Sequence, residues 1–312
     1  MSVDLWTEKY RPKTLDEYVW RNPRMRTKAE EWLAAGALPH LLFTGLPGTG
    51  KTSLAFLLLK VLEIPKADIL YINASKERKV DDIQDRMAGF VSSWALGPSG
   101  IKYIILDEMD AVGKPSQKIL RSDLEQFSDI TRVIGTANYG NMIIEALHSR
   151  FTTLNFQILD RESFLSRVFE VLVNEGVDID ADVVDTYVQA TYPDLRKCIG
   201  LVQHNTIGNK LYLPEDDNLG SREYILNMVQ LFKEGKFLEA RRLIVAQAQP
   251  EEYPEIFRTL YRNLSWFGAT QKQQDDALLI IAKSVVDLPM VGDPEILLAA
   301  CLVQLTTIAN GD

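Results

Sequence analysis

The stretch GLPGTGKTSL, residues 45–54, decides the fold class of this chain. From Gly45 to Thr52 it matches the pattern G-x-x-x-x-G-K-[ST] of a phosphate-binding loop. The apolar run HLLFT (40–44) precedes the match and the apolar run SLAFLLLKVL (53–62) follows it. This order predicts a strand, a glycine-rich loop and a helix that begins at the loop.

Such a loop has a chemical reason for each residue type. Glycines let the backbone amides approach phosphates without a Cβ clash, and the helix N-terminus adds partial positive charge there. Lys51 is expected to reach the β- and γ-phosphates of ATP, and the Thr52 hydroxyl to bind Mg²⁺. The expected nucleotide-binding residues of the loop are Gly48, Thr49, Gly50, Lys51, Thr52 and Ser53. The alternative is a glycine-rich turn without a ligand.

Five short apolar runs predict a parallel sheet that is covered on both faces. These runs are 40–45, 68–73, 102–108, 131–138 and 152–156. Longer stretches with helical spacing separate them, which indicates βα units and a doubly wound sheet. After about residue 158 we expect helices and no further strands, with a polar loop at 212–221. The pattern predicts an α/β domain over 1–157, a helical domain over 158–220 and a second helical domain over 221–312.

Two more motifs end predicted strands. IILDEMD (104–110) places Asp107 and Glu108 at the carboxyl end of a buried strand, where open α/β sheets bind ligands. Asp107 is expected to hold Mg²⁺, and Glu108 to polarise a water aimed at the γ-phosphate. Asp110 is expected to cap the next helix. In GTAN (135–138), Asn138 is expected to hold the attacking water or to sense the γ-phosphate, although an asparagine there is commonly a turn residue.

Composition limits the class of protein. The chain has 312 residues, of which 46% are hydrophobic and 25% charged, so two or three globular domains are expected. The net charge of −9 argues against a broad basic nucleic-acid surface but allows a local basic track. The two cysteines, Cys198 and Cys301, suggest neither a disulfide framework nor a zinc site, so a reducing, cytoplasmic setting is expected. Signal-peptide and membrane-spanning patterns are not found, and no membrane association is expected.

The order of the motifs resembles that of AAA+ ATPases. It runs from the P-loop through LDE (106–108), TAN (136–138) and SR (149–150) to DLRK (194–197). Three further stretches resemble clamp-loader subunits of the replication factor C type: TEKYRPKTLDEYV (7–19), GKPSQKILRSDLE (113–125) and LHSRF (147–151). Phe151 stands where the last of these motifs usually has cysteine. Within this family the chain looks most like the large subunit of bacteriophage sliding-clamp loaders.

The resemblance implies a AAA+ module with a five-stranded sheet, a helical lid and an all-α collar that oligomerises. It implies a DNA-dependent ATPase that opens a sliding clamp and loads it at primer–template junctions. The implied partners are the clamp, DNA and other loader subunits, namely copies of this chain and a small subunit, in the cytoplasm or in a host cytoplasm if the protein is viral. Two alternatives stay open: another AAA+ nucleic-acid remodeller, and a loader subunit that does not hydrolyse ATP.

The resemblance also assigns roles to residues outside the P-loop. The N-terminal box would wrap the adenine; its candidates are Glu8, Lys9, Tyr10, Arg11 and Val19. Arg196 would act as a second sensor of the γ-phosphate from the lid, and Arg150 as a finger that enters the ATP site of a neighbouring subunit. The alternatives are an arm docked for packing alone, a solvated helix arginine and an arginine that caps a helix end.

Contact with DNA is expected at two helix starts after sheet strands. The candidates are Arg78, Lys79, Lys114, Gln117, Lys118 and Arg121. Lys79 and Gln117 match positions that link DNA engagement to the ATP site in related loaders. The alternative is a pair of solvated, mixed-charge helix faces. The apolar stretch MAGFVSSWALG (87–97) is either a plug that enters the clamp or part of the core.

Overall fold

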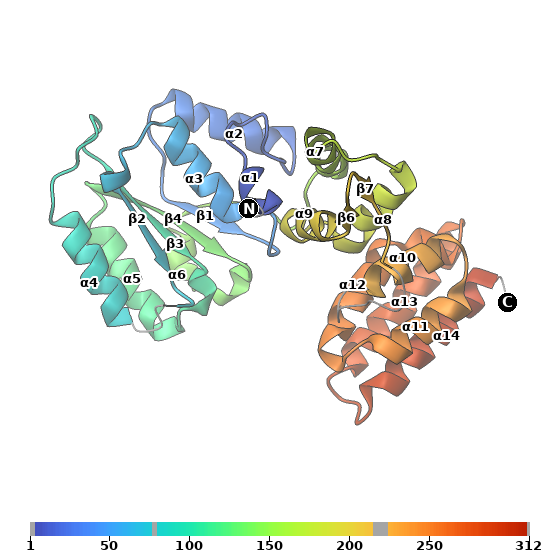
Figure 1. The fold of residues 1–312 in the computed structure, drawn as a ribbon. Helices are drawn as coiled ribbons and strands as arrows, with labels where there is room; N and C mark the ends of the chain where they lie inside the picture. The colour runs from blue at the N-terminus through green and yellow to red at the C-terminus, as the bar shows by residue number, and fades with distance from the viewer. Residues whose placement is uncertain (1–3, 77–79, 215–223, 311–312) are drawn as a thin grey trace. The chain divides into compact units, whose positions relative to one another are not determined.

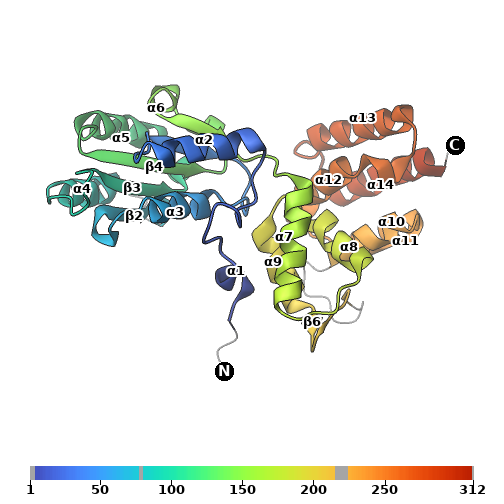
Figure 2. The same ribbon diagram turned by 90° about the horizontal axis from the view of Figure 1, so that it is seen from above.

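A computed structural model describes residues 4–76, 80–214 and 224–310. The chain forms two compact units. Unit 1 comprises Met1–Val171 and Pro193–Gly200, and unit 2 comprises Leu172–Tyr192 and Leu201–Asp312. Figures 1 and 2 show a helix-covered sheet in unit 1 and a set of helices in unit 2.

A five-stranded parallel sheet organises unit 1, with the spatial order β2-β3-β4-β1-β5. Its strands are β1 (Leu41–Thr44), β2 (Ile69–Asn73), β3 (Lys102–Asp107), β4 (Thr131–Ala137) and β5 (Thr152–Asn155). Leu41 pairs with Ile134 of β4 and with Thr152 of β5, so β1 lies between these two strands. All five predicted strands are confirmed. Because they are parallel, the loops after their carboxyl ends meet at one edge of the sheet.

Helices cover both faces of this sheet (Figure 1). In sequence order they are α2 (Pro23–Ala34), α3 (Lys51–Val61), α4 (Val80–Val91), α5 (Lys114–Gln126) and α6 (Glu145–His148). The short helix α1 (Trp6–Lys9) in the N-terminal segment has no buried residue. One buried cluster joins α2 and α3 to one face, and a second joins α4, α5 and α6 to the other. Strand β3 is buried along its whole length, which explains why its residues are apolar on both faces.

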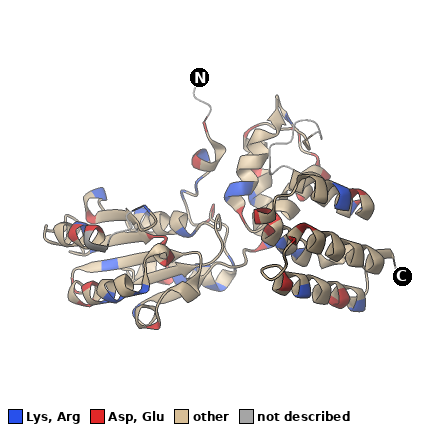
Figure 3. Cartoon of the chain, turned by 90° about the horizontal axis from the view of Figure 1, so that it is seen from below, with Lys and Arg blue, Asp and Glu red and all other residues tan. Residues whose placement is uncertain are grey.

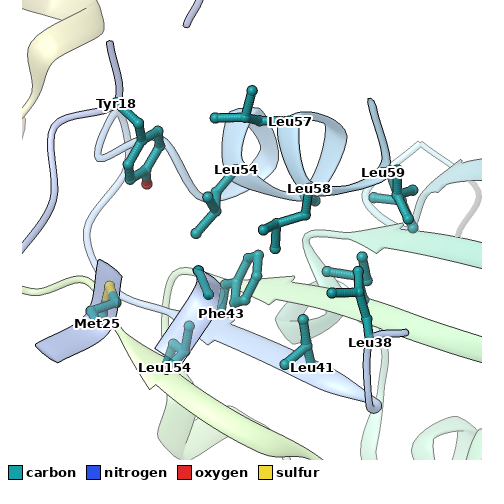
Figure 4. Close-up of a cluster of buried hydrophobic side chains, with 14 of the residues drawn as sticks. Tyr18, Met25, Leu38, Leu41, Phe43, Leu54, Leu57, Leu58, Leu59 and Leu154 are labelled. Carbon is teal, nitrogen blue, oxygen red and sulfur yellow. The ribbon is translucent and has the colours of Figure 1, made fainter. Parts of the chain in front are cut away.

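The contact between α3 and β1 fixes the loop between them. Figure 4 shows Leu54 and Leu58 pointing from α3 towards Phe43 of β1. These two leucines are one helical turn apart, and all three side chains are fully buried. Packing therefore sets the position at which α3 begins, and with it the position of residues 45–50.

The remaining helices follow the predicted pattern. They are α7 (Arg161–Asn174), α8 (Ala181–Thr191), α9 (Leu195–His204), α10 (Tyr224–Lys233), α11 (Phe237–Gln247), α12 (Tyr253–Arg262), α13 (Gln271–Asp287) and α14 (Pro294–Asn310). The expectation that strands end near residue 158 was wrong in one detail. Residues Thr206–Ile207 (β6) and Lys210–Leu211 (β7) form a two-stranded antiparallel hairpin, with Gly208 at φ 62° in its turn. Most of the predicted polar loop 212–221 lies outside the described residues.

Short 3-10 turns lie between these elements. They are η1 (Lys66–Asp68), η2 (Met109–Ala111), η3 (Gly140–Met142), η5 (Pro250–Glu252) and η6 (Leu264–Phe267).

Residues 158–220, expected to form a domain of their own, are divided between the two units. The three-domain division stays a prediction. Among the described residues, no helix has both the length and the apolar character needed to cross a membrane.

Gly45 tests the packing of the loop directly. It has φ +145°, and a Cβ there would lie 2.5 Å from the backbone carbonyl carbon of Phe156. Gly45→Ala should lower the free energy of unfolding by about 1–3 kcal/mol, because backbone atoms cannot move aside cheaply. Gly89→Ala is the matched control: Gly89 lies in α4 with nothing within 4 Å of the added Cβ, so a gain of about 0.5–1 kcal/mol is expected. Urea denaturation followed by circular dichroism measures both. Equal stability of the Gly45 variant and the wild type would contradict the packing described.

Candidate functional site

The predicted phosphate-binding loop occurs at the N-terminus of α3. Gly50 is the N-cap of this helix, with φ 85° and ψ 12°, and Gly48 has φ 72°. Both values lie in the left-handed region that favours glycine. The backbone amides of the first helical turn have no partner within the helix, so they are available to an anion.

Lys51 is buried at the centre of the site, with 7% of its surface exposed. Its Nζ donates hydrogen bonds to the carbonyls of Gly45 and Leu46, both at 2.8 Å, and to Oδ1 of Asn138 at 2.9 Å. Burial lowers the pKa of Lys51 to about 8, against the opposing effect of nearby acidic groups. The ammonium therefore links the P-loop to the end of β4 by hydrogen bonds to neutral acceptors.

A second group of contacts surrounds Asp107, at the end of β3. Its Oδ1 accepts hydrogen bonds from the hydroxyls of Thr52 at 2.7 Å and Thr136 at 2.6 Å. Its Oδ2 accepts one from the hydroxyl of Tyr71 at 2.9 Å. Carboxylate and hydroxyl oxygens are suitable Mg²⁺ ligands, and Mg²⁺ at nucleotide sites commonly uses one or two carboxylates together with phosphates and water. The adjacency of Asp107 and Thr52 therefore fits a bound Mg²⁺.

Glu108 and Asp110 shape the turn that follows β3. Glu108 has φ 57° and ψ 45°, a left-handed conformation that is uncommon for glutamate, and its N–H donates to Oγ1 of Thr136. Asp110 does not cap the next helix as expected. Its Oδ2 accepts hydrogen bonds from the backbone N–H groups of Asn138 and Tyr139, both at 3.0 Å. Asp110 thus holds the segment that carries Asn138 against the end of β3.

A recess of about 620 Å³, including its open mouth, lies beside the P-loop within unit 1. The predicted residues that line it are Tyr10, Arg11, Val19, Gly48, Thr49, Gly50, Ser53 and Arg196. The structure adds lining residues that sequence reasoning missed: Thr7, Pro12, Glu17, Tyr18, Leu159, Arg167, Leu195 and Ile199. The recess joins the N-terminal segment, the P-loop and two helices of the predicted lid, which fits a bound nucleotide.

Two of the missed residues have defined structural roles. Tyr18 is buried, and its hydroxyl lies 3.3 Å from the carbonyl oxygen of Gly50, so it supports the loop from behind; burial raises its pKa. Arg167 is 6% exposed and donates to the carbonyl of Tyr10 at 3.0 Å and to Glu170 at 2.7 Å. The only sequence signal for Tyr18 was its place beside Val19, and no local pattern marks Arg167.

Two predicted adenine contacts, Glu8 and Lys9, do not line the recess. Glu8 forms an ion pair with Arg11 at 3.0 Å, and the Nζ of Lys9 lies 5.3 Å from the centre of the Tyr10 ring. Both residues therefore brace neighbours that do line it. Their predicted contact with adenine does not fit these positions.

The start of α9 lies over the phosphate-binding loop. A Cβ added to Gly48 would meet a carboxylate oxygen of Asp194 at 1.6 Å, so a larger residue here would displace the Asp194 side chain as well as adopt a strained φ of +72°. Arg196 is exposed and lines the recess, and its positive charge helps to lower the pKa of Lys51. Asp194 and Arg196 thus bring one negative and one positive charge to the phosphate end of the recess.

Arg150 lies at the other edge of the sheet. It immediately precedes Phe151 and β5, and the β1–β5 register is parallel from Leu41 and Thr152 onward. The P-loop follows the carboxyl end of β1, so the four residues of β1, about 13 Å of strand, separate the two edges. The exposed guanidinium of Arg150 donates to Oε1 of Glu125 at 2.7 Å.

The predicted DNA contacts have different surroundings. Lys114, Lys118 and Arg121 are exposed and follow one face of α5 at spacings of four and three residues, and Arg121 pairs with Glu125 at 3.0 Å. Gln117 is 1% exposed; its amide nitrogen donates to the carbonyls of Val112 and Met142, and its Oε1 accepts from the N–H of Ile144. A direct phosphate contact by Gln117 does not fit this burial. Arg78 and Lys79 lie outside the described residues.

Charge is mixed over both units. Figure 3 shows basic and acidic residues alternating along the helices. In the stretch expected to be either plug or core, Met87 is 2% exposed and belongs to the core, whereas Trp94 is 94% exposed. The core reading therefore holds for Met87, and the plug reading stays a prediction for the exposed end of the stretch.

Comparison with known proteins places this site in a family context. Residues 41–157 match the family described as ATPase family associated with various cellular activities (AAA). The replication factor C small subunit of Picrophilus torridus is 35% identical over 249 residues, which cover 78% of this chain and 77% of that protein. Replication factor C small subunit 1 of Pyrobaculum islandicum is 29% identical over 99% of this chain and 96% of its own length.

Solved structures with a similar fold include the Thermotoga maritima RuvB Holliday junction branch migration motor. It superposes with a TM-score of 0.52 at 19% identity and covers 96% of this chain and 87% of the RuvB chain. At this identity the similarity concerns the fold alone.

The pKa of Lys51 predicts a pH dependence of stability in the nucleotide-free protein. Between about pH 8 and the ordinary value of 10.5, the unfolded chain holds a proton at Lys51 that the folded chain has lost. The free energy of unfolding should therefore rise with pH across this window. Lys51→Met removes this titrating group, so the difference in unfolding free energy between wild type and variant should rise over the same range. Urea denaturation at a series of pH values measures it, and a difference that does not change with pH would contradict the burial of a charged Lys51.

Proposed function

We propose, because this chain belongs to the replication factor C small-subunit family of AAA+ ATPases, that it is the ATP-hydrolysing subunit of a DNA-replication clamp loader. In this role it opens a sliding clamp and places it on primer–template DNA. Its partners are the clamp, the DNA and further loader subunits, namely copies of this chain and a small subunit. It works in the cytoplasm, and in a host-cell cytoplasm if the bacteriophage resemblance holds.

One observation carries the multisubunit part of this proposal: Arg150 and the P-loop lie at opposite edges of the same parallel sheet. An arginine at the amino-terminal edge is poorly placed to reach a phosphate bound at the carboxyl-terminal edge of its own chain. A guanidinium is nevertheless a strong stabiliser of charge on a transferring phosphoryl group. Arg150 therefore completes the ATP site of a neighbouring subunit, and release from Glu125 frees it to do so.

Within one subunit, the other site residues have separate roles in binding and hydrolysing ATP. Lys51 exchanges the carbonyls of Gly45 and Leu46 for phosphate oxygens, which are stronger acceptors. Thr52 and Asp107 would hold Mg²⁺, which would offset the negative charge of the phosphates. Glu108 accepts a proton from the attacking water, and Asn138 orients that water.

The recess beside the P-loop holds the base and sugar end of ATP. Tyr10 and Val19 offer apolar surface, and Arg11 closes the same wall. Arg196 reaches the γ-phosphate from the start of α9 and so links the nucleotide state to the position of the lid. Three domains, 1–157, 158–220 and 221–312, serve as ATPase module, lid and collar in this account.

DNA binding is assigned to the exposed face of α5. Lys114, Lys118 and Arg121 follow the phosphate backbone. Arg78 and Lys79, which lie outside the described residues, are part of the same proposal. Gln117 acts as a link instead of a contact, because its hydrogen bonds tie α5 to Met142 and Ile144, in the segment between Asn138 and Arg150.

The two alternatives are less well supported. Another AAA+ nucleic-acid remodeller would share the fold, as the RuvB similarity illustrates, but the relatives that determine the family are replication factor C subunits. A subunit that does not hydrolyse ATP has no need of the arrangement in which Lys51, Glu108 and Asn138 converge on one edge of the sheet.

Glu108→Gln tests the assignment of the base. Hydrolysis in the assembled loader should fall by about 100-fold or more, because the amide cannot accept a proton from water. Binding of a fluorescent ATP analogue should be preserved. Glu145→Gln, at an exposed glutamate in α6, is the matched control and should hydrolyse ATP like the wild type. Phosphate release and analogue fluorescence measure the two quantities. Loss of nucleotide binding in the Glu108 variant would make this residue structural.

Mixing two inactive variants tests the finger. Arg150→Ala subunits keep their own Lys51, whereas Lys51→Ala subunits keep their finger, so some junctions in mixed complexes join an intact site to an intact finger. ATPase activity should reappear on mixing, since a finger is worth about 10³–10⁵ in rate in GTPase systems. Mass measurement must first show that mixed complexes form. If they form and no activity returns, Arg150 does not act between subunits.

A further inference from the structure

Among the described hydrogen bonds to the Asp107 carboxylate, the one from Tyr71 is the only one that comes from neither the start of α3 nor β4. The Tyr71 hydroxyl donates to Oδ2 at 2.9 Å, whereas Thr52 and Thr136 both donate to Oδ1. The two oxygens of this carboxylate therefore have different surroundings. Oδ1 faces Thr52, the other Mg²⁺ ligand of the proposed function, and Oδ2 faces Tyr71.

Three neighbouring elements position Tyr71, two of them through its backbone and one through its ring. Strand β2 pairs with β3 so that Tyr71 lies opposite Ile105, two residues before Asp107. The ring of Phe56, from α3, lies 5.6 Å from the Tyr71 ring, centre to centre. Arg86, from α4, donates to the Tyr71 carbonyl at 3.0 Å. The backbone and ring of Tyr71 are thus positioned by contacts that do not involve the carboxylate of Asp107.

We propose that Tyr71 is a positioning residue for the Mg²⁺ site: by holding Oδ2, it keeps Oδ1 of Asp107 turned towards Thr52. This inference rests on the assignment of Asp107 and Thr52 to Mg²⁺ in the proposed function. Without the hydroxyl, both remaining hydrogen bonds end on Oδ1, and the carboxylate can pivot about that atom. Groups that orient a metal ligand through a hydrogen bond typically change metal affinity when they are removed.

The exposure of Tyr71 also bears on its role. With 39% of its surface exposed, the side chain borders solvent at the site, so it is not simply a core residue whose hydroxyl needs a partner.

Tyr71→Phe tests the proposal, since it removes the hydroxyl and leaves the ring against Phe56. Binding of a fluorescent ATP analogue is measured in EDTA and along a Mg²⁺ titration. Affinity in EDTA should be unchanged, while the Mg²⁺ concentration for half of the metal-dependent gain should rise by about 10-fold. Tyr139→Phe, at a tyrosine that is 60% exposed beyond the end of β4, is the matched control and should behave like the wild type.

The remaining outcomes separate this inference from the proposed function. Asp107→Asn should abolish the metal-dependent gain. If it does so while Tyr71→Phe titrates like the wild type, the role of Tyr71 is refuted and the metal site stands. If Tyr71→Phe loses affinity equally in EDTA and in Mg²⁺, Tyr71 supports the fold and not the metal. If the wild type shows no gain, or Asp107→Asn keeps it, the metal site is wrong and the role of Tyr71 falls with it.

Discussion

The rest of the site depends on the hydrogen bonds of the buried Lys51 ammonium. A charge with 7% exposure is tolerated only if it is fully paired, and here two loop carbonyls and the Asn138 amide supply the pairing. The same three contacts join the P-loop to the end of β4. Phosphate oxygens that replace these acceptors would therefore break contacts of both the P-loop and the end of β4. Asn138 is also hydrogen-bonded through its backbone N–H to Asp110, just after β3, so the end of β3 is linked to the same contacts.

The two edges of the parallel sheet carry different functional residues. Lys51, Asp107, Glu108 and Asn138 converge at the carboxyl edge because parallel strands end there together. Arg150 lies at the amino edge because it precedes a strand instead of following one. In our account, one chain can bind ATP but needs a neighbour to hydrolyse it, so assembly on clamp and DNA controls the reaction through geometry.

Local patterns predicted the elements and the main site residues, but not the contacts between distant segments. The five strands and the P-loop could be predicted because apolar runs and glycine spacing involve only residues close together in the sequence. The hydrogen bonds of Asp107 to Tyr71 and Thr136 join residues 36 and 29 positions away, and depend on strand order, which no local pattern reveals. For the same reason Asp110 was expected to cap a helix, and Gln117 to face DNA. The burial of Gln117 depends on which face of α5 packs against the sheet.

The central claim is that this chain uses ATP to place a clamp on DNA, and a clamp-transfer assay tests it most directly. The chain is combined with its candidate small subunit, a fluorescent clamp and nicked circular DNA, and the fluorescence retained on DNA is measured after gel filtration. Our account predicts retained clamp with ATP and wild-type subunits, and none with Lys51→Ala subunits. Active ATP hydrolysis in a complex that contains the clamp, without any transfer to DNA, would contradict it.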